Sequence, residues 1–144
     1  MAQGNGPVVV GVDGSPPSLT ALAWAAEEAS LKKLDLHVVV AWHMPLMLGM
    51  PLPLPTGFDP LEPARDVLEQ AQRAVADSYP DLVVKTHVEE GPAARGLVRT
   101  AQAVGASLLV VGARGHGEVA GLLMGSVSEN VATHAKCPVV VVRH

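Results

Sequence analysis

Short apolar runs rich in valine alternate along this chain with segments of helical periodicity, and this alternation constrains the fold more than any other feature. Each run is too short for a buried helix and is bounded by glycine, proline or polar residues, as buried strands are. The predicted strands are 8–12, 36–42, 83–90, 107–112 and 138–143. Strands that alternate with helices form a parallel sheet with helices on both faces. We therefore expect a single α/β domain, Rossmann-like, over residues 1–144.

Helix boundary signals agree with this alternation. Ser15 precedes Pro16 as an N-cap precedes a first helical residue, and Pro92 and Gly105 bracket another helical segment. The predicted helices are 16–33, 61–79, 92–104 and 126–135. The intervening segment 43–60 has too many prolines for a helix or a central strand, so we expect an irregular apolar loop there.

Composition excludes several classes of protein. The chain is 49% hydrophobic and 17% charged with a net charge of −4, which is typical of a globular protein and argues against nucleic acid or anionic membrane as partner. A single cysteine, Cys137, excludes an internal disulfide and a multi-cysteine metal site. The first residues do not form a signal peptide, and no apolar run is long enough for a membrane span. We expect a cytoplasmic protein.

Glycine is concentrated after the fourth predicted strand, where it makes up five of the fifteen residues of "GARGHGEVAGLLMGS". A P-loop is excluded because no Gly-Lys pair occurs in the chain. The segment 115–120 matches the dinucleotide pattern G-x-G-x-x-A, but no acidic residue follows about 20 residues later, so that match is accidental. The remaining spacing is Gly112-x2-Gly115-x9-Gly125-Ser126.

This spacing suits a bound phosphate chain. Gly112 ends a strand and Gly125 precedes a helix, whose N–H groups and dipole attract anions. Ser126 and Ser128 could add hydroxyl donors. The alternative is a plain turn followed by a capping box, in which Ser126 caps the helix with Glu129.

Asp13 ends the first predicted strand in "GVDGS". A carboxylate there could accept hydrogen bonds from ribose hydroxyls or hold a phosphate-bound metal ion, and the alternative is an ordinary Asp-Gly turn. If Asp13 and the glycine segment serve one ligand, strands one and four are neighbours. Right-handed crossovers then give the strand order 3-2-1-4-5, with the ligand crevice where the order reverses.

The chain resembles the universal stress protein family. The resemblance is carried by "GVDGSPPSLTALAWAAEEA", "EEGPAARGLVRTAQ" and "SLLVVGARGHGEVAGLLMGSVSENVATHAKCPVVVVR", and it covers all of the chain except the loop. The G-x2-G-x9-G-[ST] spacing is that of the family's ATP-binding members. The resemblance implies ATP, with or without Mg²⁺, at twelve positions: Gly11, Val12 and Asp13 beside adenosine, Ala41 at the adenine edge, Gly112, Arg114, Gly115 and His116 on one side of the phosphates, and Gly125, Ser126, Val127 and Ser128 on the other.

Two classes of function remain open. The first is an adenine-nucleotide binding module for stress response or regulation, which reports its ligand through its own conformation or a protein partner. The second is a slow ATPase or nucleotide-dependent transferase, which the absence of a P-loop lysine and of an obvious base disfavours. No metal site is expected, because the six histidines are dispersed without a ligand spacing.

Two surfaces could contact partners. The last strand, with Val139 to Val142, is an edge that no charge blunts, so we expect a homodimer through it, in agreement with the resemblance. The alternative is that the preceding helix or His144 covers that edge. The loop 43–60 could be a disordered connection, a lid over the adenine, or an adaptable methionine-rich partner surface.

Overall fold

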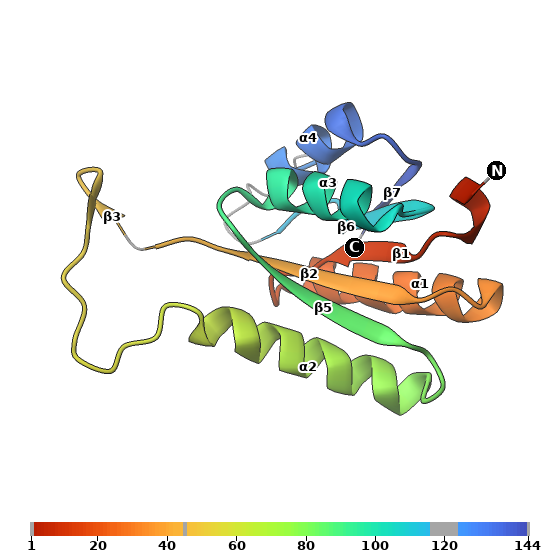
Figure 1. Ribbon diagram of the computed structural model, residues 1–144, viewed down its shortest axis with the longest axis horizontal. Coiled ribbons are helices and arrows are strands. Elements are labelled where there is room, and N and C mark those ends of the chain that lie inside the picture. The colour runs from red at the N-terminus through yellow and green to blue at the C-terminus, as the bar shows by residue number, and fades with distance from the viewer. Residues whose placement is uncertain (1, 45, 116–123, 144) are drawn as a thin grey trace.

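The computed structural model describes residues 2–44, 46–115 and 124–143, and its elements follow the predicted alternation (Figure 1). The strands of the main sheet are β1 (Val8–Gly11), β2 (Leu36–Trp42), β5 (Val84–Glu90), β6 (Leu108–Gly112) and β7 (Val139–Val142). The helices are α1 (Pro16–Lys32), α2 (Glu62–Ser78), α3 (Ala93–Val104) and α4 (Ser126–His134), with a short 3₁₀ helix, Ala2–Asn5, ahead of β1.

The sheet is parallel throughout, in the order β5-β2-β1-β6-β7. This confirms the predicted order 3-2-1-4-5. Val10 of β1 lies opposite Val38 of β2 on one side and Val110 of β6 on the other. All three valines have no exposed surface, which is why the central strands read as continuous apolar runs.

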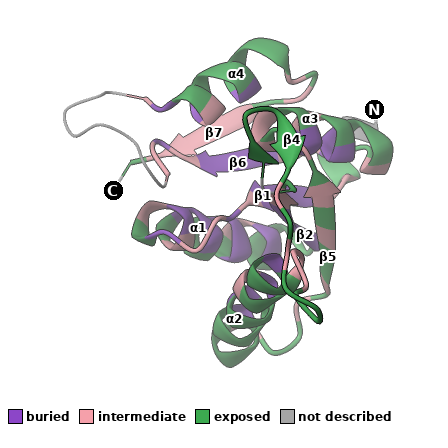
Figure 2. Ribbon diagram, turned by 90° about the vertical axis from the view of Figure 1, so that its left-hand side faces the viewer, coloured by how far each residue is buried: buried purple, intermediate pink, exposed green. Residues whose placement is uncertain are grey.

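Helices cover both faces of the sheet, α1 and α2 on one and α3 and α4 on the other (Figure 2). Alternate strand residues point to opposite faces, so neighbouring valines belong to different cores. Val10 packs with Leu22 of α1 and Leu68 of α2. Val9 packs with Leu97 of α3, in the same cluster as Val131 of α4. The two helical layers cover the faces of the sheet but not the carboxyl ends of its central strands, where a crevice lies.

Helix ends agree with the sequence signals at most positions. Ser15 is the N-cap of α1, and its Oγ accepts a hydrogen bond from the Ser18 N–H at 3.3 Å. Gly105 ends α3 with a φ of 66°, a left-handed conformation that glycine adopts without steric cost. In the described part of the chain, no helix is both long and apolar enough to cross a membrane.

The segment 43–60, here called the arm, differs from the expectation of a wholly irregular loop. It contains a two-stranded antiparallel hairpin of β3 (Leu46–Met47) and β4 (Met50–Pro51), and it projects well beyond the body of the molecule (Figure 1). Leu48 and Gly49 both have positive φ, 53° and 78°, which is the geometry of a tight hairpin turn. The expectation was wrong because proline is compatible with an edge position in so small a sheet.

Two histidines that are far apart in the sequence meet on the α3 face of the sheet. His37 of β2 is 7% exposed, and its Nδ1 lies 2.7 Å from Nε2 of His87 in β5. One of these nitrogens donates and the other accepts, and the two rings are nearly parallel. Burial, and next the positive charges of His87 and Lys85, hold the pKa of His37 below its usual value.

Acidification is expected to destabilise the fold through His37. Because its pKa is lowered on folding from the ordinary 6.5, the unfolded chain binds more protons below that pH. The contribution of neutral His37 to the free energy of unfolding is fully present above the ordinary pKa of 6.5. It is lost as the pH falls through the lowered pKa of the folded state. Urea denaturation at about pH 7.5 and about pH 5 should therefore show a smaller acid loss for His37→Gln than for wild type. The exposed-site variant His43→Gln should behave as wild type, and equal losses in all three proteins would contradict the assignment.

Candidate functional site

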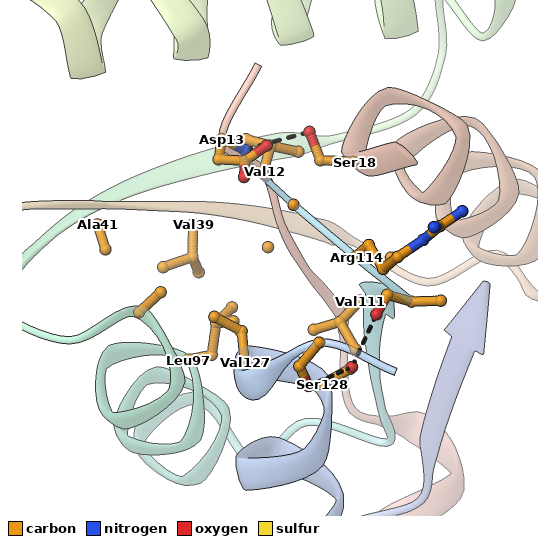
Figure 3. A pocket seen from close by; sticks show the side chains of 16 residues that line it. Val12, Asp13, Ser18, Val39, Ala41, Leu97, Val111, Arg114, Val127 and Ser128 are labelled. Atoms are coloured by element: carbon orange, nitrogen blue, oxygen red, sulfur yellow. Dashed lines mark hydrogen bonds between the residues drawn. The ribbon is translucent and has the colours of Figure 1, made fainter. Parts of the chain in front are cut away.

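A crevice opens at the carboxyl ends of the central strands, between the two helical layers (Figure 3). The chain leaves β1 towards β2 on one side, while β6 lies on the other side, so the crevice is at the point where the strand order reverses. Such points are the ligand sites of open α/β sheets. Its described lining residues are Gly11, Val12, Asp13, Ser18, Val39, Ala41, Ala93, Leu97, Val111, Gly112, Ala113, Arg114, Gly115, Gly125, Val127 and Ser128.

Asp13 is fixed by the first turn of α1. Its Oδ1 accepts hydrogen bonds from the Ser15 N–H at 2.9 Å and from the Ser15 hydroxyl. The Asp13 N–H donates to Ser18 Oγ at 3.2 Å, and the Ser18 hydroxyl donates to the Ser15 carbonyl. The turn that caps the helix therefore also orients the carboxylate. The predicted turn is confirmed, and a ligand role for Asp13 stays a prediction.

Gly115 lies directly against the other oxygen of Asp13. A Cβ atom added at Gly115 would come within 2.5 Å of Asp13 Oδ2, closer than a real contact permits. The two sequence features that suggested a ligand, Asp13 and the glycine segment, therefore meet at one place. Glycine is required at 115 for the carboxylate to keep its position.

Two further glycines of the crevice, Gly11 and Gly112, have packing reasons. A Cβ on Gly11 would lie 2.7 Å from the Leu97 side chain of α3, and one on Gly112 would lie 3.0 Å from the Pro17 carbonyl of α1. Both glycines let a helix approach the ends of the strands closely. At Gly11 and Gly112 the crevice is therefore lined by backbone atoms.

Backbone hydrogen bonds of Ala113 connect the glycine segment to the sheet. Its N–H donates to the Val142 carbonyl at 2.8 Å, and its carbonyl accepts from the Gly125 N–H at 2.6 Å and from Ser128 Oγ at 3.0 Å. Ser128 is 1% exposed, and its hydroxyl also lies 3.0 Å from the Gly125 carbonyl. The Ser128 hydroxyl thus holds the start of α4 against the end of β6.

The alternative of a capping box at Ser126 is wrong. Gly125 is the N-cap of α4, in an extended conformation, and no side-chain capping hydrogen bond to this helix is found among the described residues. The Glu129 N–H donates to the Gly125 carbonyl at 3.1 Å, so Ser126 is already the first helical residue. The first turn of α4, from which Val127 and Ser128 line the crevice, carries the partial positive charge of a helix N-terminus.

Apolar side chains form the opposite part of the crevice. Val39 and Ala41 come from β2, Leu97 from α3 and Val127 from α4, and Figure 3 shows them on the side away from Arg114. Sequence reasoning identified Ala41 and Val127 but missed Val39, Val111, Ala93 and Leu97, together with Ser18 and Ala113. These residues carry no signal of their own, because a valine or leucine that lines a crevice is identical in pattern to one that fills a core.

The remaining predicted residues are placed unevenly. Arg114 lines the crevice, and its side chain extends towards α1 (Figure 3). Ser126 begins α4 but is not among the lining residues. His116 lies outside the described residues. Within the described ranges, no group of three or more His, Cys, Asp or Glu residues could hold a metal ion. Cys137 packs beside the α3–α4 core, and burial raises the pKa of its thiol.

Fold and crevice together define an open α/β protein with a crevice at the switch point of its sheet. The sequence model of the universal stress protein family matches residues 4–143, and the chain belongs to that family. A universal stress protein of Mycolicibacterium smegmatis is 40% identical over 138 residues, covering 95% of this chain and 45% of that protein. One of Mycobacterium tuberculosis is 38% identical over 140 residues, with the same coverage. The chain thus spans about half the length of these curated relatives.

Solved structures agree on the fold. A universal stress protein in complex with cAMP is 31% identical, with a TM-score of 0.72 and 95% coverage of both chains. UspA of Lactobacillus plantarum is 25% identical, with a TM-score of 0.76 and coverage of 96% of this chain and 97% of its own. The universal stress protein of Archaeoglobus fulgidus in complex with dAMP has a TM-score of 0.69, and at 24% identity over 94% of this chain and 95% of its own it supports the fold alone.

Removing the Ser128 hydroxyl is expected to loosen the start of α4. Because the Ala113 carbonyl keeps its bond from Gly125, Ser128→Ala should lower the free energy of unfolding by only about 0.5–1.5 kcal/mol. Urea denaturation measures this change. Ser30→Ala, the same substitution at an exposed position of α1, should cost less, and an equal cost at both sites would contradict the role given to Ser128.

Proposed function

We propose that the crevice binds an adenine nucleotide, ATP in the first place, and that the protein is a regulatory module whose conformation or partner binding depends on that ligand. The observation that carries this proposal is the meeting of Asp13 and Gly115 across a crevice that also contains the start of α4. The carboxylate suits ribose hydroxyls, and backbone without side chains allows the close approach of a phosphate chain. The helix N-terminus suits the negative charge of that chain. The cAMP complex of a 31% identical relative supports the same ligand class.

The apolar part of the crevice suits the base. Val39 and Leu97 offer flat contact to an adenine ring, and Ala41, near the end of β2, is small enough to leave the strand's backbone accessible to the ring's edge. Asp13 lies on the opposite side of the crevice from Leu97 and Val127 (Figure 3). A nucleoside bound along this direction has its ribose at Asp13 and its phosphates between Gly115 and the first turn of α4. Arg114 and His116 would then supply positive charge or hydrogen bonds to the outer phosphates, with or without Mg²⁺.

Binding without efficient catalysis fits this lining better than phosphoryl transfer does. Among the described lining residues, Arg114 has the only cationic side chain and Asp13 the only carboxylate. Asp13 already accepts two hydrogen bonds from Ser15, so it is poorly suited to serve as a base. Transfer of a phosphoryl group requires charge neutralisation and a positioned nucleophile. Slow hydrolysis is the second candidate, and release of ADP by the purified protein would detect it.

Asp13→Asn is expected to weaken ATP binding. Asparagine keeps the shape and the acceptor towards Ser15, but an amide can replace the oxygen that faces Gly115, and the charge is lost. Hydrogen bonds to a charged group contribute about 1.5–3 kcal/mol, so the Kd measured by calorimetry should rise roughly 10- to 150-fold. Inorganic triphosphate, which has no ribose, should be affected much less.

The matched control is Asp66→Asn on the exposed face of α2, which makes the same change in net charge and should bind ATP as wild type does. Equal weakening of ATP and triphosphate in the presence of magnesium would favour a metal-holding role for Asp13. Unchanged ATP affinity in Asp13→Asn would overturn the ribose assignment.

We further propose that two chains associate through β7. This strand is an edge of the sheet, pairing only with β6 among the described strands, and its four valines are half-buried. The Pro138 carbonyl accepts a hydrogen bond from Leu109 of β6, and the Val142 carbonyl accepts one from Ala113, which directly follows β6. By alternation, the N–H and C=O groups of Val139 and Val141 point outwards. Two such edges can pair about a two-fold axis.

Val141→Pro is expected to shift the protein to monomer. Proline removes an outward N–H and leaves the bonds to β6 in place, so the fold should survive at this edge position. Val141→Thr keeps the N–H and a similar volume, and it should remain a dimer. Light scattering at micromolar concentration with circular dichroism as a fold check measures both. A monomeric wild type or a dimeric proline variant would exclude this interface.

A further inference from the structure

The arm carries an unusual concentration of methionine. Three of the chain's five methionines, Met44, Met47 and Met50, occur within seven residues at a spacing of three. Their exposed fractions are 37%, 61% and 67%, so they do not fill a core. The arm projects from the carboxyl end of β2, away from both helical layers (Figure 1). Packing within the described structure therefore does not account for these side chains.

The hairpin brings two of the three thioethers together. Met47 and Met50 are direct cross-strand partners on either side of the turn at Leu48 and Gly49. Residues directly opposite each other in an antiparallel pair have side chains on one face, with Cβ atoms about 4.5–5.5 Å apart. A flexible methionine side chain spans such a gap easily, so one ion can contact both sulfur atoms. Met44 lies three residues before Met47 in the sequence and adds a third thioether to the same stretch of the chain.

The donor set selects the kind of ion. Thioether sulfur is soft and uncharged, and among biological metals it favours Cu(I). From His43 to Phe58 the sequence contains no carboxylate, and the first acidic side chain is Asp59. Calcium, magnesium and manganese, whose protein sites are built mainly on carboxylates, therefore have no carboxylate ligand on this stretch. We propose that Met44, Met47 and Met50 form a binding site for a soft monovalent metal ion, Cu(I), on the arm.

This site is separate from the nucleotide crevice and does not depend on the function proposed for it. None of the three methionines lines the crevice. The same apolar surface could instead serve only as a hydrophobic contact. The two explanations differ in one respect: a hydrophobic contact tolerates leucine in place of methionine, whereas a thioether site does not, because leucine has similar volume without sulfur.

Calorimetric titration of the untagged full chain with silver nitrate in chloride-free buffer tests the proposal, Ag(I) being a redox-inert probe for Cu(I). The protein carries Cys137→Ala, because a thiol would bind the same ion. We expect one Ag(I) per chain. Since loss of even an outer partner of a metal ligand costs about 10- to 100-fold in affinity, Met47→Leu with Met50→Leu should weaken binding at least tenfold. Leu46→Ala with Leu48→Ala, which removes apolar surface and keeps every sulfur, should bind as the parent does.

The dependence on pH provides a second, independent measurement. Thioethers take up no proton, whereas histidine ligands become protonated below a pKa of about 6.5. Affinity for Ag(I) should therefore be the same at about pH 7.5 and about pH 5, and Cu(I) under anaerobic reduction should give an X-ray absorption spectrum dominated by sulfur ligands. Unchanged affinity in the double leucine variant, a loss of affinity in acid, or no binding by the parent would each overturn the proposal.

Discussion

The backbone hydrogen bonds of one residue, Ala113, hold together the parts on which the site depends. Its N–H joins the end of β6 to Val142 of β7, and its carbonyl receives both the Gly125 N–H and the Ser128 hydroxyl. The bond between Ala113 and Gly125 brings the two ends of the glycine segment together at the carboxyl end of β6. These bonds fix the start of α4 beside the crevice. They thereby set the direction in which the dipole of α4 points.

Across the crevice a second small network performs the corresponding task for Asp13. Ser15 both caps α1 and donates to the carboxylate, and Gly115 leaves room for the carboxylate's other oxygen. Hydrogen bonds within the turn thus hold Asp13 Oδ1 and Ser15 in place in the absence of a ligand. This preorganisation, with few charged side chains among the described lining residues, supports the proposed binding of a nucleotide more than a phosphoryl transfer.

Much of the architecture was predictable because it depends on local patterns. The strand order, the N-cap at Ser15 and the C-cap at Gly105 follow from apolar runs, caps and right-handed crossovers, and the structure confirms them. The cap of α4 was not predictable. Gly125 and Ser126 both suit an N-cap, and the bond from Gly125 to Ala113, which decides between them, lies outside any local pattern. The hairpin of the arm was missed because its prolines argue against regular structure.

The sequence by itself determined the class of fold, the family and the identity of the residues at the strand ends, because these rest on periodicity and on short spacings along the chain. Only the tertiary structure decided which distant residues meet. It brought Asp13 to Gly115, Leu97 to Gly11, and His37 to His87 on the neighbouring strand. Such contacts depend on strand register and on the depth to which a helix packs, and neither quantity is written in the local sequence.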